Sequence, residues 1–427
     1  MIGLHDVKHQ PAAVNLLERA IRADRMPHAF AFCGPDGVGK RLMARRLAAI
    51  LLCKRPVGVP PGLHQRGPQK RPTEAAPAEL GMFADAGPVA PGAPEPPPTG
   101  PIHACGACAA CQYGEQTPHP DLRIVGRHLR QHSRESRVRD SRGVEISIDV
   151  IREFLLEPCS ETAVAGGAKV FIIEQAERLS ISAQNALLKT LEEPPPCTYI
   201  VLLSTGTARL MATTLSRCQV IPFRPLPEEF IVERLHALAD VPESAARFLA
   251  RFSGGSLGQS LRMHRAGVPA FKQAWLGELL ALSSARDPGL GNVLKHLDEG
   301  GRQIAEDMLR AEASEGGSDA NADADHGTAE LQREGARLSF ALLSFALRDG
   351  LWMSRAAGSD RLIHTDQPEL GSLAAGRWDA RALLGAIGSV QRFEAMLASN
   401  VNVPLAAEVL LNELLSAAAP ARPARTG

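Results

Sequence analysis

Aromatic residues are scarce in this sequence, and neither sign of charge is in excess. Phe, Trp and Tyr together make up 4% of the 427 residues, while 47 Lys and Arg balance 47 Asp and Glu. A protein with zero formal charge is not expected to devote its whole surface to nucleic acid, although a local basic patch is compatible with that balance. Any contact with DNA should therefore be local.

The sequence also lacks a long apolar run. No stretch approaches the roughly 18 uninterrupted apolar residues of a membrane span, and Met1 to Gln10 has no basic segment followed by an apolar one, the mark of a secretory signal. We therefore expect a cytoplasmic protein. In that compartment the eight cysteines are expected to be metal ligands and buried thiols rather than disulfides.

Short apolar runs alternate with helical patterns through the first half of the chain. The runs lie at 29–33, 122–125, 169–173, 199–203 and 220–223. This alternation predicts an α/β domain over residues 1–225 with a doubly wound parallel sheet, which has helices on both faces.

Beyond residue 225 the sequence reads as helices, and we expect a small helical unit at 226–265 and a larger helical domain at 266–427. Two segments break the regular patterns. Residues 54–104 hold 13 of the 32 prolines without any periodicity, which predicts a disordered insertion. The acidic, Gly- and Ala-rich residues 313–328 predict a flexible loop.

A glycine-rich loop, G-P-D-G-V-G-K, follows the first apolar run and ends at Lys40. Its backbone amides and lysine could cradle a triphosphate. A working P-loop next has a Ser or Thr that holds Mg²⁺, and this chain has Arg41. Nucleotide binding therefore stays open, because a turn that binds nothing explains the glycines equally well. The candidate nucleotide-binding residues are Gly34, Gly37, Gly39, Lys40 and Arg41.

The apolar run at 169–173 should end in an Asp-Glu pair if the chain hydrolyses ATP, one carboxylate for Mg²⁺ and one to activate water. The residues found there are Glu174 and Gln175, and an amide cannot act as a general base. Together with Arg41, these two departures predict that the chain has no ATPase activity of its own.

Cys105, Cys108 and Cys111 place three thiols within seven residues, a spacing typical of a zinc site. Cys53 is the expected fourth ligand, because closing the long loop between it and Cys105 costs little extra entropy. His103 or His119 could take that place instead, and three unrelated thiols in a turn are the alternative without metal. Four thiolates would make the site structural, since no coordination position stays open.

Two sets of arginines are candidates for function. Arg217, in Leu215-Ser-Arg-Cys218, follows a strand pattern and could be an ordinary surface residue or a finger that reaches the γ-phosphate of a neighbouring subunit. The arginine-rich stretch from Arg123 to Arg142 is most simply a solvated loop, with a phosphate-tracking patch as the alternative.

Five segments together resemble the delta-prime family of bacterial clamp-loader subunits, part of the DNA polymerase III holoenzyme. The resemblance covers roughly 1–53 and 105–265, and more loosely the helical remainder. The five segments are Pro27-His-Ala-Phe30, the cysteines with His119-Pro-Asp121, Asn185-Ala-Leu-Leu-Lys-Thr-Leu-Glu-Glu-Pro194, Leu215-Ser-Arg-Cys218 and Gly255-Ser-Leu-Gly258.

The resemblance implies an α/β AAA+ P-loop domain with a zinc-binding insertion, a small helical lid and an all-α collar that joins subunits. Delta-prime members are stators, and the family implies that Arg217 serves the ATP site of an adjacent motor subunit. The implied partners are gamma/tau-type motor subunits and the delta subunit, with the sliding clamp and primed DNA reached through the complex. The implied cofactors are a structural Zn²⁺ and, in a degenerate site, ATP.

Two other functions compete with this one. The chain could be an active AAA+ ATPase of the motor type, which Arg41 and Gln175 disfavour. It could also be a zinc-stabilised DNA-binding module that uses the Arg123 to Arg142 stretch, which the neutral charge disfavours. Nothing in the sequence resembles the carboxylates of a two-metal polymerase or exonuclease site, so polymerase chemistry would belong to the assembly.

Overall fold

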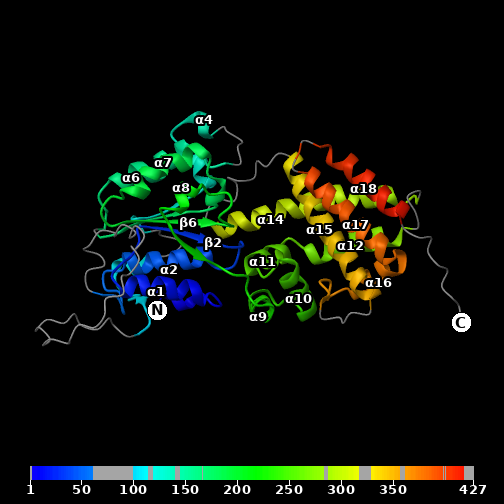
Figure 1. Cartoon of the computed structure of the whole chain (residues 1–427), viewed down its shortest axis with the longest axis horizontal. Helices are drawn as coiled ribbons and strands as arrows, with labels where there is room; N and C mark the ends of the chain where they lie inside the picture. The colour runs from blue at the N-terminus through cyan, green and yellow to red at the C-terminus, as the bar shows by residue number, and fades with distance from the viewer. Residues whose placement is uncertain are drawn as a thin grey trace, which may run out of the picture. The chain divides into compact units, whose positions relative to one another are not determined.

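A computed structural model of the chain describes residues 2–60, 100–113, 119–139, 145–165, 167–282, 287–316, 328–355, 361–397, 399 and 401–417. The chain divides into two compact units, Met1–Pro225 and Leu226–Gly427 (Figure 1). The two units are described separately below.

The first unit is built on a five-stranded parallel sheet. Its strands run in the order β4 (Leu122–Val125), β5 (Lys169–Ile173), β6 (Thr198–Ser204), β2 (Ala29–Cys33) and β7 (Gln219–Pro222), and every neighbouring pair is parallel. All residues of β2, β5 and β6 are buried, as expected for strands covered on both faces. The predicted parallel sheet is confirmed.

Helices cover both faces of this sheet (Figure 1). On one side lie α1 (Pro11–Arg22) and α2 (Lys40–Leu52), and on the other lie α5 (Ile148–Ile151), α6 (Glu157–Ser160) and α7 (Ile181–Glu192). Alternate residues of the strands point to opposite faces. One core cluster accordingly joins Ala31 and Phe171 with Leu155 and Leu187. A π-helical turn, Arg152–Leu156, lies between α5 and α6.

The segment predicted as a disordered insertion, 54–104, differs from that prediction at both ends. Strand β3 (His103–Ala104) pairs with β1 (Ile2–Gly3) in an antiparallel ribbon, and Val57 bridges His103 on its other side. These backbone hydrogen bonds order the two ends of the segment. Residues 61–99 lie outside the described part of the chain.

The arginine-rich stretch is also more regular than a loop. It contains a 3₁₀ helix, Arg127–His132, and a short helix, α4 (Ser136–Arg139), while residues 140–144 lie outside the described part. The remaining elements of the first unit are η1 (Leu4–Asp6), α3 (Ala109–Gln112), η4 (Ala176–Arg178) and α8 (Ala212–Leu215).

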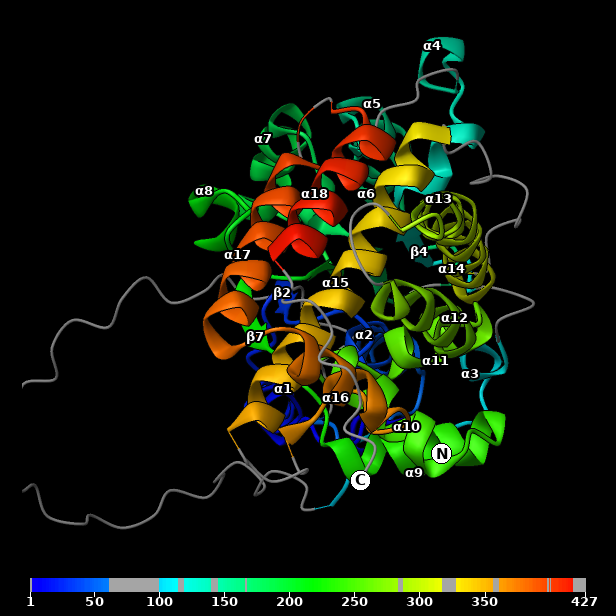
Figure 2. The same ribbon diagram turned by 90° about the vertical axis from the view of Figure 1, so that its right-hand side faces the viewer.

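All regular elements among the described residues of the second unit are helices, which confirms the predicted helical C-terminal region. Its helices are α9 (Glu228–Ala239), α10 (Glu243–Phe252), α11 (Leu257–Arg265), α12 (Val268–Ala281), α13 (Leu290–Lys295), η5 (His296–Gly300), α14 (Gly301–Gly316), α15 (Thr328–Ser354), α16 (Pro368–Arg377), α17 (Ala380–Met396) and α18 (Val403–Ala417) (Figure 2). The division into a lid and a collar stays a prediction. None of the described helices is both long and apolar enough to cross a bilayer.

Helices α14 and α15 cross at very short range. A Cβ added to Gly335 would lie 2.3 Å from the carbonyl carbon of Gly301, so the crossing requires glycine. Helix α14 extends to Gly316 and α15 begins at Thr328, and residues 317–327 of the predicted acidic loop lie outside the described part.

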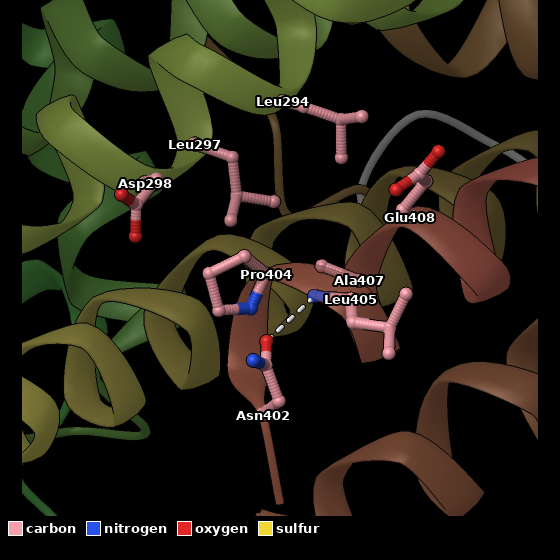
Figure 3. A pocket seen from close by; sticks show the side chains of 8 residues that line it. All are labelled: Leu294, Leu297, Asp298, Asn402, Pro404, Leu405, Ala407 and Glu408. Atoms are coloured by element: carbon pink, nitrogen blue, oxygen red, sulfur yellow. Dashed lines mark hydrogen bonds between the residues drawn. The ribbon is translucent and has the colours of Figure 1, made fainter.

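A cavity of about 290 Å³ lies beside α13, η5 and the start of α18, where Asn402 Oδ1 accepts the N–H of Leu405 at 3.1 Å (Figure 3).

A buried charged side chain links three helices of the second unit. Lys272 of α12 is fully buried, and its Nζ lies 2.5 Å from Asp366 just before α16. The same ammonium sits 3.7 Å from the ring centre of Phe248 of α10, a cation–π contact. Burial lowers the pKa of Lys272, and the charge of Asp366 opposes that shift.

Replacing Lys272 with methionine should lower the free energy of unfolding of the second unit by about 2–4 kcal/mol, because Asp366 is left buried without its counterion. All three tryptophans, Trp275, Trp352 and Trp378, lie in this unit, so urea unfolding followed by their fluorescence reports on it selectively. Lys295→Met is the control, since Lys295 is 70% exposed and pairs loosely with Glu299. Equal losses in the two variants would contradict a special contribution from the buried pair.

Candidate functional site

The P-loop connects β2 to α2, and its backbone requires glycine. A Cβ on Gly34 would lie 2.3 Å from the carbonyl oxygen of Phe223. Gly37 and Gly39 have φ values of 69° and 104°, which favour glycine, and Gly39 directly precedes α2. The sequence pattern therefore forms the strand–loop–helix turn that it predicts.

Lys40 folds back onto the loop that precedes it. Its Nζ donates to the carbonyl oxygens of Gly34 at 2.5 Å and Pro35 at 2.6 Å, and to Asp36 Oδ1 at 3.3 Å. Burial lowers the pKa of Lys40, while Asp36 acts in the opposite direction. An ammonium has three donors, so these acceptors satisfy it, and a bound phosphate would have to replace them.

Arg41 and Glu174 form a two-pronged ion pair beside the P-loop. Arg41 Nε donates to Oε1 and its terminal nitrogen donates to Oε2, across 133 positions of sequence. The arginine side chain is 34% exposed and the glutamate 13%. Because the guanidinium fork engages both carboxylate oxygens, a metal would have to compete with Arg41 for this carboxylate. Arginine itself offers no lone pair.

The residues after Glu174 complete this corner of the site. Gln175 has left-handed backbone angles, φ 50° and ψ 47°, and its carbonyl oxygen accepts the N–H of Arg178 at 2.8 Å. Glu177, which sequence reasoning missed, accepts the N–H of Thr205 at the end of β6. It also lies close enough to Lys40 to favour its charged form. No motif marks Glu177, because the contact arises from the folding of two strand ends.

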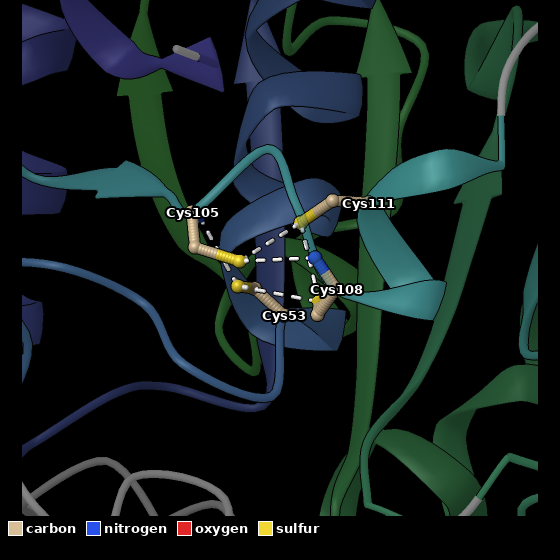
Figure 4. A group of neighbouring side chains, drawn as sticks. All are labelled: Cys53, Cys105, Cys108 and Cys111. Atoms are coloured by element: carbon tan, nitrogen blue, oxygen red, sulfur yellow. Dashed lines mark hydrogen bonds between the residues drawn. The ribbon is translucent and has the colours of Figure 1, made fainter.

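Cys53, Cys105, Cys108 and Cys111 meet in one cluster (Figure 4). Their four sulfur atoms lie within 4.8 Å of one another, with separations of 3.9 Å for Cys53 to Cys108, 3.9 Å for Cys105 to Cys111 and 3.5 Å for Cys108 to Cys111. A tetrahedral zinc site with Zn–S bonds of about 2.3 Å has edges of about 3.8 Å. A disulfide would require about 2.05 Å. The four thiols therefore fit a tetrahedral metal and not a disulfide.

Backbone groups support thiolates in this cluster. The N–H of Cys105 donates to Cys53 Sγ at 3.3 Å, and the N–H of Cys108 donates to Cys105 Sγ at 3.4 Å. Burial opposes ionisation of Cys108, but backbone N–H groups of Lys54 and Cys111 outweigh it and bring its pKa to about 6. Burial raises the pKa of Cys111, so this thiol would need the metal to ionise at neutral pH.

Neither histidine considered from the sequence joins this group. His103 Nδ1 lies 3.1 Å from the carbonyl oxygen of Ala104, and His119 Nδ1 accepts the N–H of Asp121 at 3.1 Å. Asp121 in turn accepts the N–H groups of Val164 at 2.7 Å and Ala165 at 2.8 Å. Within the described ranges, the cluster that could hold a metal ion consists of the four cysteines.

Arg217 lies in the turn between α8 and β7, an edge strand of the sheet. Its side chain is 30% exposed and is paired with Glu192 of α7, which is 49% exposed. Sequence reasoning missed this partner, although the two residues belong to the segments Asn185 to Pro194 and Leu215 to Cys218 that it had singled out. The structure thus places Arg217 at the surface but in contact with its own chain.

A parallel sheet with a P-loop after β2, followed by a helical unit, defines an α/β protein of the P-loop class. A family model described as "DNA polymerase III, delta subunit" matches residues 9–63 and 98–227. The DNA polymerase III subunit delta' of Pseudomonas aeruginosa is 34% identical over 243 residues, which is 56% of this chain and 57% of that protein. The delta' subunit of Bacillus subtilis is 30% identical over 244 residues, 57% of this chain and 56% of that protein.

The delta' subunit of Escherichia coli is 39% identical over 118 residues, 28% of this chain and 35% of that protein. A solved DNA polymerase III gamma subunit-related protein of Thermotoga maritima has a TM-score of 0.38 at 16% identity, over 96% of this chain and 99% of that one. The alignments span little more than half of the Pseudomonas aeruginosa and Bacillus subtilis delta' subunits and about a third of the Escherichia coli one. Over that matched N-terminal region, the chain is similar to DNA polymerase III delta' subunits.

Proposed function

We propose that this chain is a non-hydrolysing subunit of the replicative clamp loader, which helps to place the sliding clamp on primed DNA. Its similarity to DNA polymerase III delta' subunits supports the clamp-loader role. The Arg41–Glu174 ion pair carries the non-hydrolysing part of the proposal. Arg41 stands where a working P-loop has its metal-binding hydroxyl, and the pair engages the carboxylate that would hold Mg²⁺.

The same pair argues against the alternative of an active motor-type ATPase. Glu174 could bind Mg²⁺ only after its bidentate ion pair with Arg41 is broken. Breaking a partly buried pair of this kind costs free energy. The next residue, Gln175, has an amide that cannot take a proton from water. ATP bound at the P-loop would therefore be held without hydrolysis.

We propose gamma/tau-type motor subunits and the delta subunit as the partners of this chain, with Arg217 completing the nucleotide site of the adjacent motor. Arg217 supports this role because it is partly exposed and lies beside an edge strand, where a neighbour can approach. A guanidinium is suited to the task, since its fork matches the oxygens of a phosphate.

We also propose that the four cysteines bind a structural zinc ion. Zinc bound there would tie Cys53, at the end of α2, to the knuckle formed by Cys105, Cys108 and Cys111. The observed sulfur separations and the backbone donors to sulfur support zinc, and four thiolates leave it no open position for catalysis.

The DNA-binding alternative is not favoured by the contacts of its arginines. Arg134 lies 3.6 Å from Glu153 and 3.5 Å from Glu157, and Arg137 pairs with Glu135. These acidic partners offset much of the local positive charge, so the stretch is a weak candidate for a phosphate-tracking patch.

The purified chain should show no Mg²⁺-dependent ATP turnover above that of its own Lys40→Ala variant. When mixed with motor and delta subunits, it should form a stable complex whose mass, measured by light scattering, includes this chain. Turnover by the isolated chain that Lys40→Ala abolishes would instead identify an independent ATPase. Failure to enter the complex would exclude a clamp-loader role.

A further inference from the structure

We propose that Glu192 is a positioning residue for Arg217, which holds the guanidinium against this chain until a neighbour's triphosphate takes its place. This inference rests on the proposed function of Arg217. Arg217 Nε donates to Glu192 Oε1 at 2.8 Å, and a terminal nitrogen donates to the same oxygen. The pair joins the end of α7 to the turn before β7.

A second set of contacts fixes the direction of the guanidinium. The other terminal nitrogen of Arg217 donates to the carbonyl oxygen of Thr213 at 2.7 Å and to Ser216 Oγ at 3.3 Å. All three guanidinium nitrogens therefore contact this chain. In this arrangement the guanidinium donates to Glu192, Thr213 and Ser216. It must give up these contacts before it can donate to a phosphate.

The position of Glu192 in its helix also points to a role outside the helix. Glu192 is the last residue of α7, where the partial negative charge of the helix end disfavours a carboxylate and favours a cation. The positive charge of Arg217 offsets this unfavourable placement. Glutamate at this position is thus explained by its partner rather than by helix stability.

The Arg217–Glu192 ion pair is weak enough to break and form again readily. Both side chains are partly exposed, 30% for Arg217 and 49% for Glu192. An exposed pair of this kind favours the paired state by at most about fivefold, equivalent to about 1 kcal/mol. A triphosphate presents more negative charge and can accept two parallel hydrogen bonds from arginine. The neighbour's nucleotide should therefore displace Glu192 once the subunits come together.

The test is Glu192→Gln in a clamp loader reconstituted from all of its subunits. Glutamine keeps the size of the side chain and removes its charge. ATP turnover without DNA should rise about two- to fivefold, because Arg217 no longer has to leave Glu192 before it reaches the neighbour's nucleotide. The DNA-stimulated rate should change less than about twofold. The double variant Glu192→Gln/Arg217→Ala should match Arg217→Ala alone.

Glu243→Gln is the matched control, because it removes a carboxylate that pairs with Arg247 on the surface of the other unit. It should alter neither rate. If Arg217→Ala leaves turnover unchanged, the finger itself is wrong and this inference falls with it. If Arg217→Ala slows turnover but Glu192→Gln leaves the DNA-independent rate unchanged or lowers it, Arg217 still acts as a finger, and the proposed role of Glu192 is rejected.

Discussion

Replacing Arg217 with alanine is expected to slow ATP hydrolysis at the neighbouring subunit's site by roughly 10³-fold or more, the usual contribution of an arginine finger supplied in trans. The reason is electrostatic, since the guanidinium stabilises charge that develops on the transferred phosphoryl group. The measurement requires a reconstituted loader in which only the motor subunit next to this chain keeps its P-loop lysine. Other sites then cannot mask the loss.

Arg209→Ala is the control for this experiment, because Arg209 is another exposed arginine of the same unit. It should leave turnover unchanged. Arg217→Lys should recover only part of the rate, since lysine keeps the charge but loses the planar fork. Both alanine variants should assemble normally by light scattering. Wild-type turnover by a fully assembled Arg217→Ala complex would rule out the finger role.

The purified chain is expected to contain about one zinc ion per molecule, and Cys108→Ser should abolish stoichiometric binding. Structural zinc is worth about 10–16 kcal/mol in isolated peptides. The sheet is held by its own core, so metal loss should unfold chiefly the cysteine segment. Elemental analysis gives the metal content, and hydrogen exchange at residues 54–60 and 100–113 should accelerate at least about tenfold as the local structure opens.

Acid provides an independent test of the same site. Thiolates bind zinc and thiols do not, so zinc should be released as the pH falls and protons compete for sulfur.

Cys197→Ser is the matched control for Cys108→Ser, since Cys197 lies outside the cluster, and it should keep the metal. Full zinc content in Cys108→Ser, or a wild-type chain purified without metal under non-chelating conditions, would contradict the proposed site.

The positions of β2, β5 and β6 were readable from the sequence because each is a short apolar run buried on both faces. The run at 169–173 predicts β5 residue for residue, and the run at 29–33 predicts β2. Helix α7 begins after Ser180, a typical capping residue, whose Oγ accepts the N–H of Ala183 at 3.2 Å. These features depend on local periodicity and capping.

Some boundaries escaped this reasoning. The two-residue strand His103–Ala104 carries no strand pattern of its own and forms only because Ile2–Gly3 and Val57 present backbone partners. Helix α4 was missed for a similar reason, since its four residues include two arginines and a single buried residue, Val138. Short elements like these are set by their neighbours, which composition does not reveal.

The sequence by itself determined the chemistry available to this protein: a P-loop with arginine in place of its metal-binding hydroxyl, a Cys-x-x-Cys-x-x-Cys run and an arginine in a Leu-Ser-Arg-Cys segment. Only the tertiary structure decided how these groups are paired. It joined Arg41 to Glu174, Cys53 to the cysteine knuckle and Arg217 to Glu192. The physical reason is that side-chain chemistry and short-range periodicity are written along the chain, whereas contacts across dozens of residues depend on strand order and helix packing.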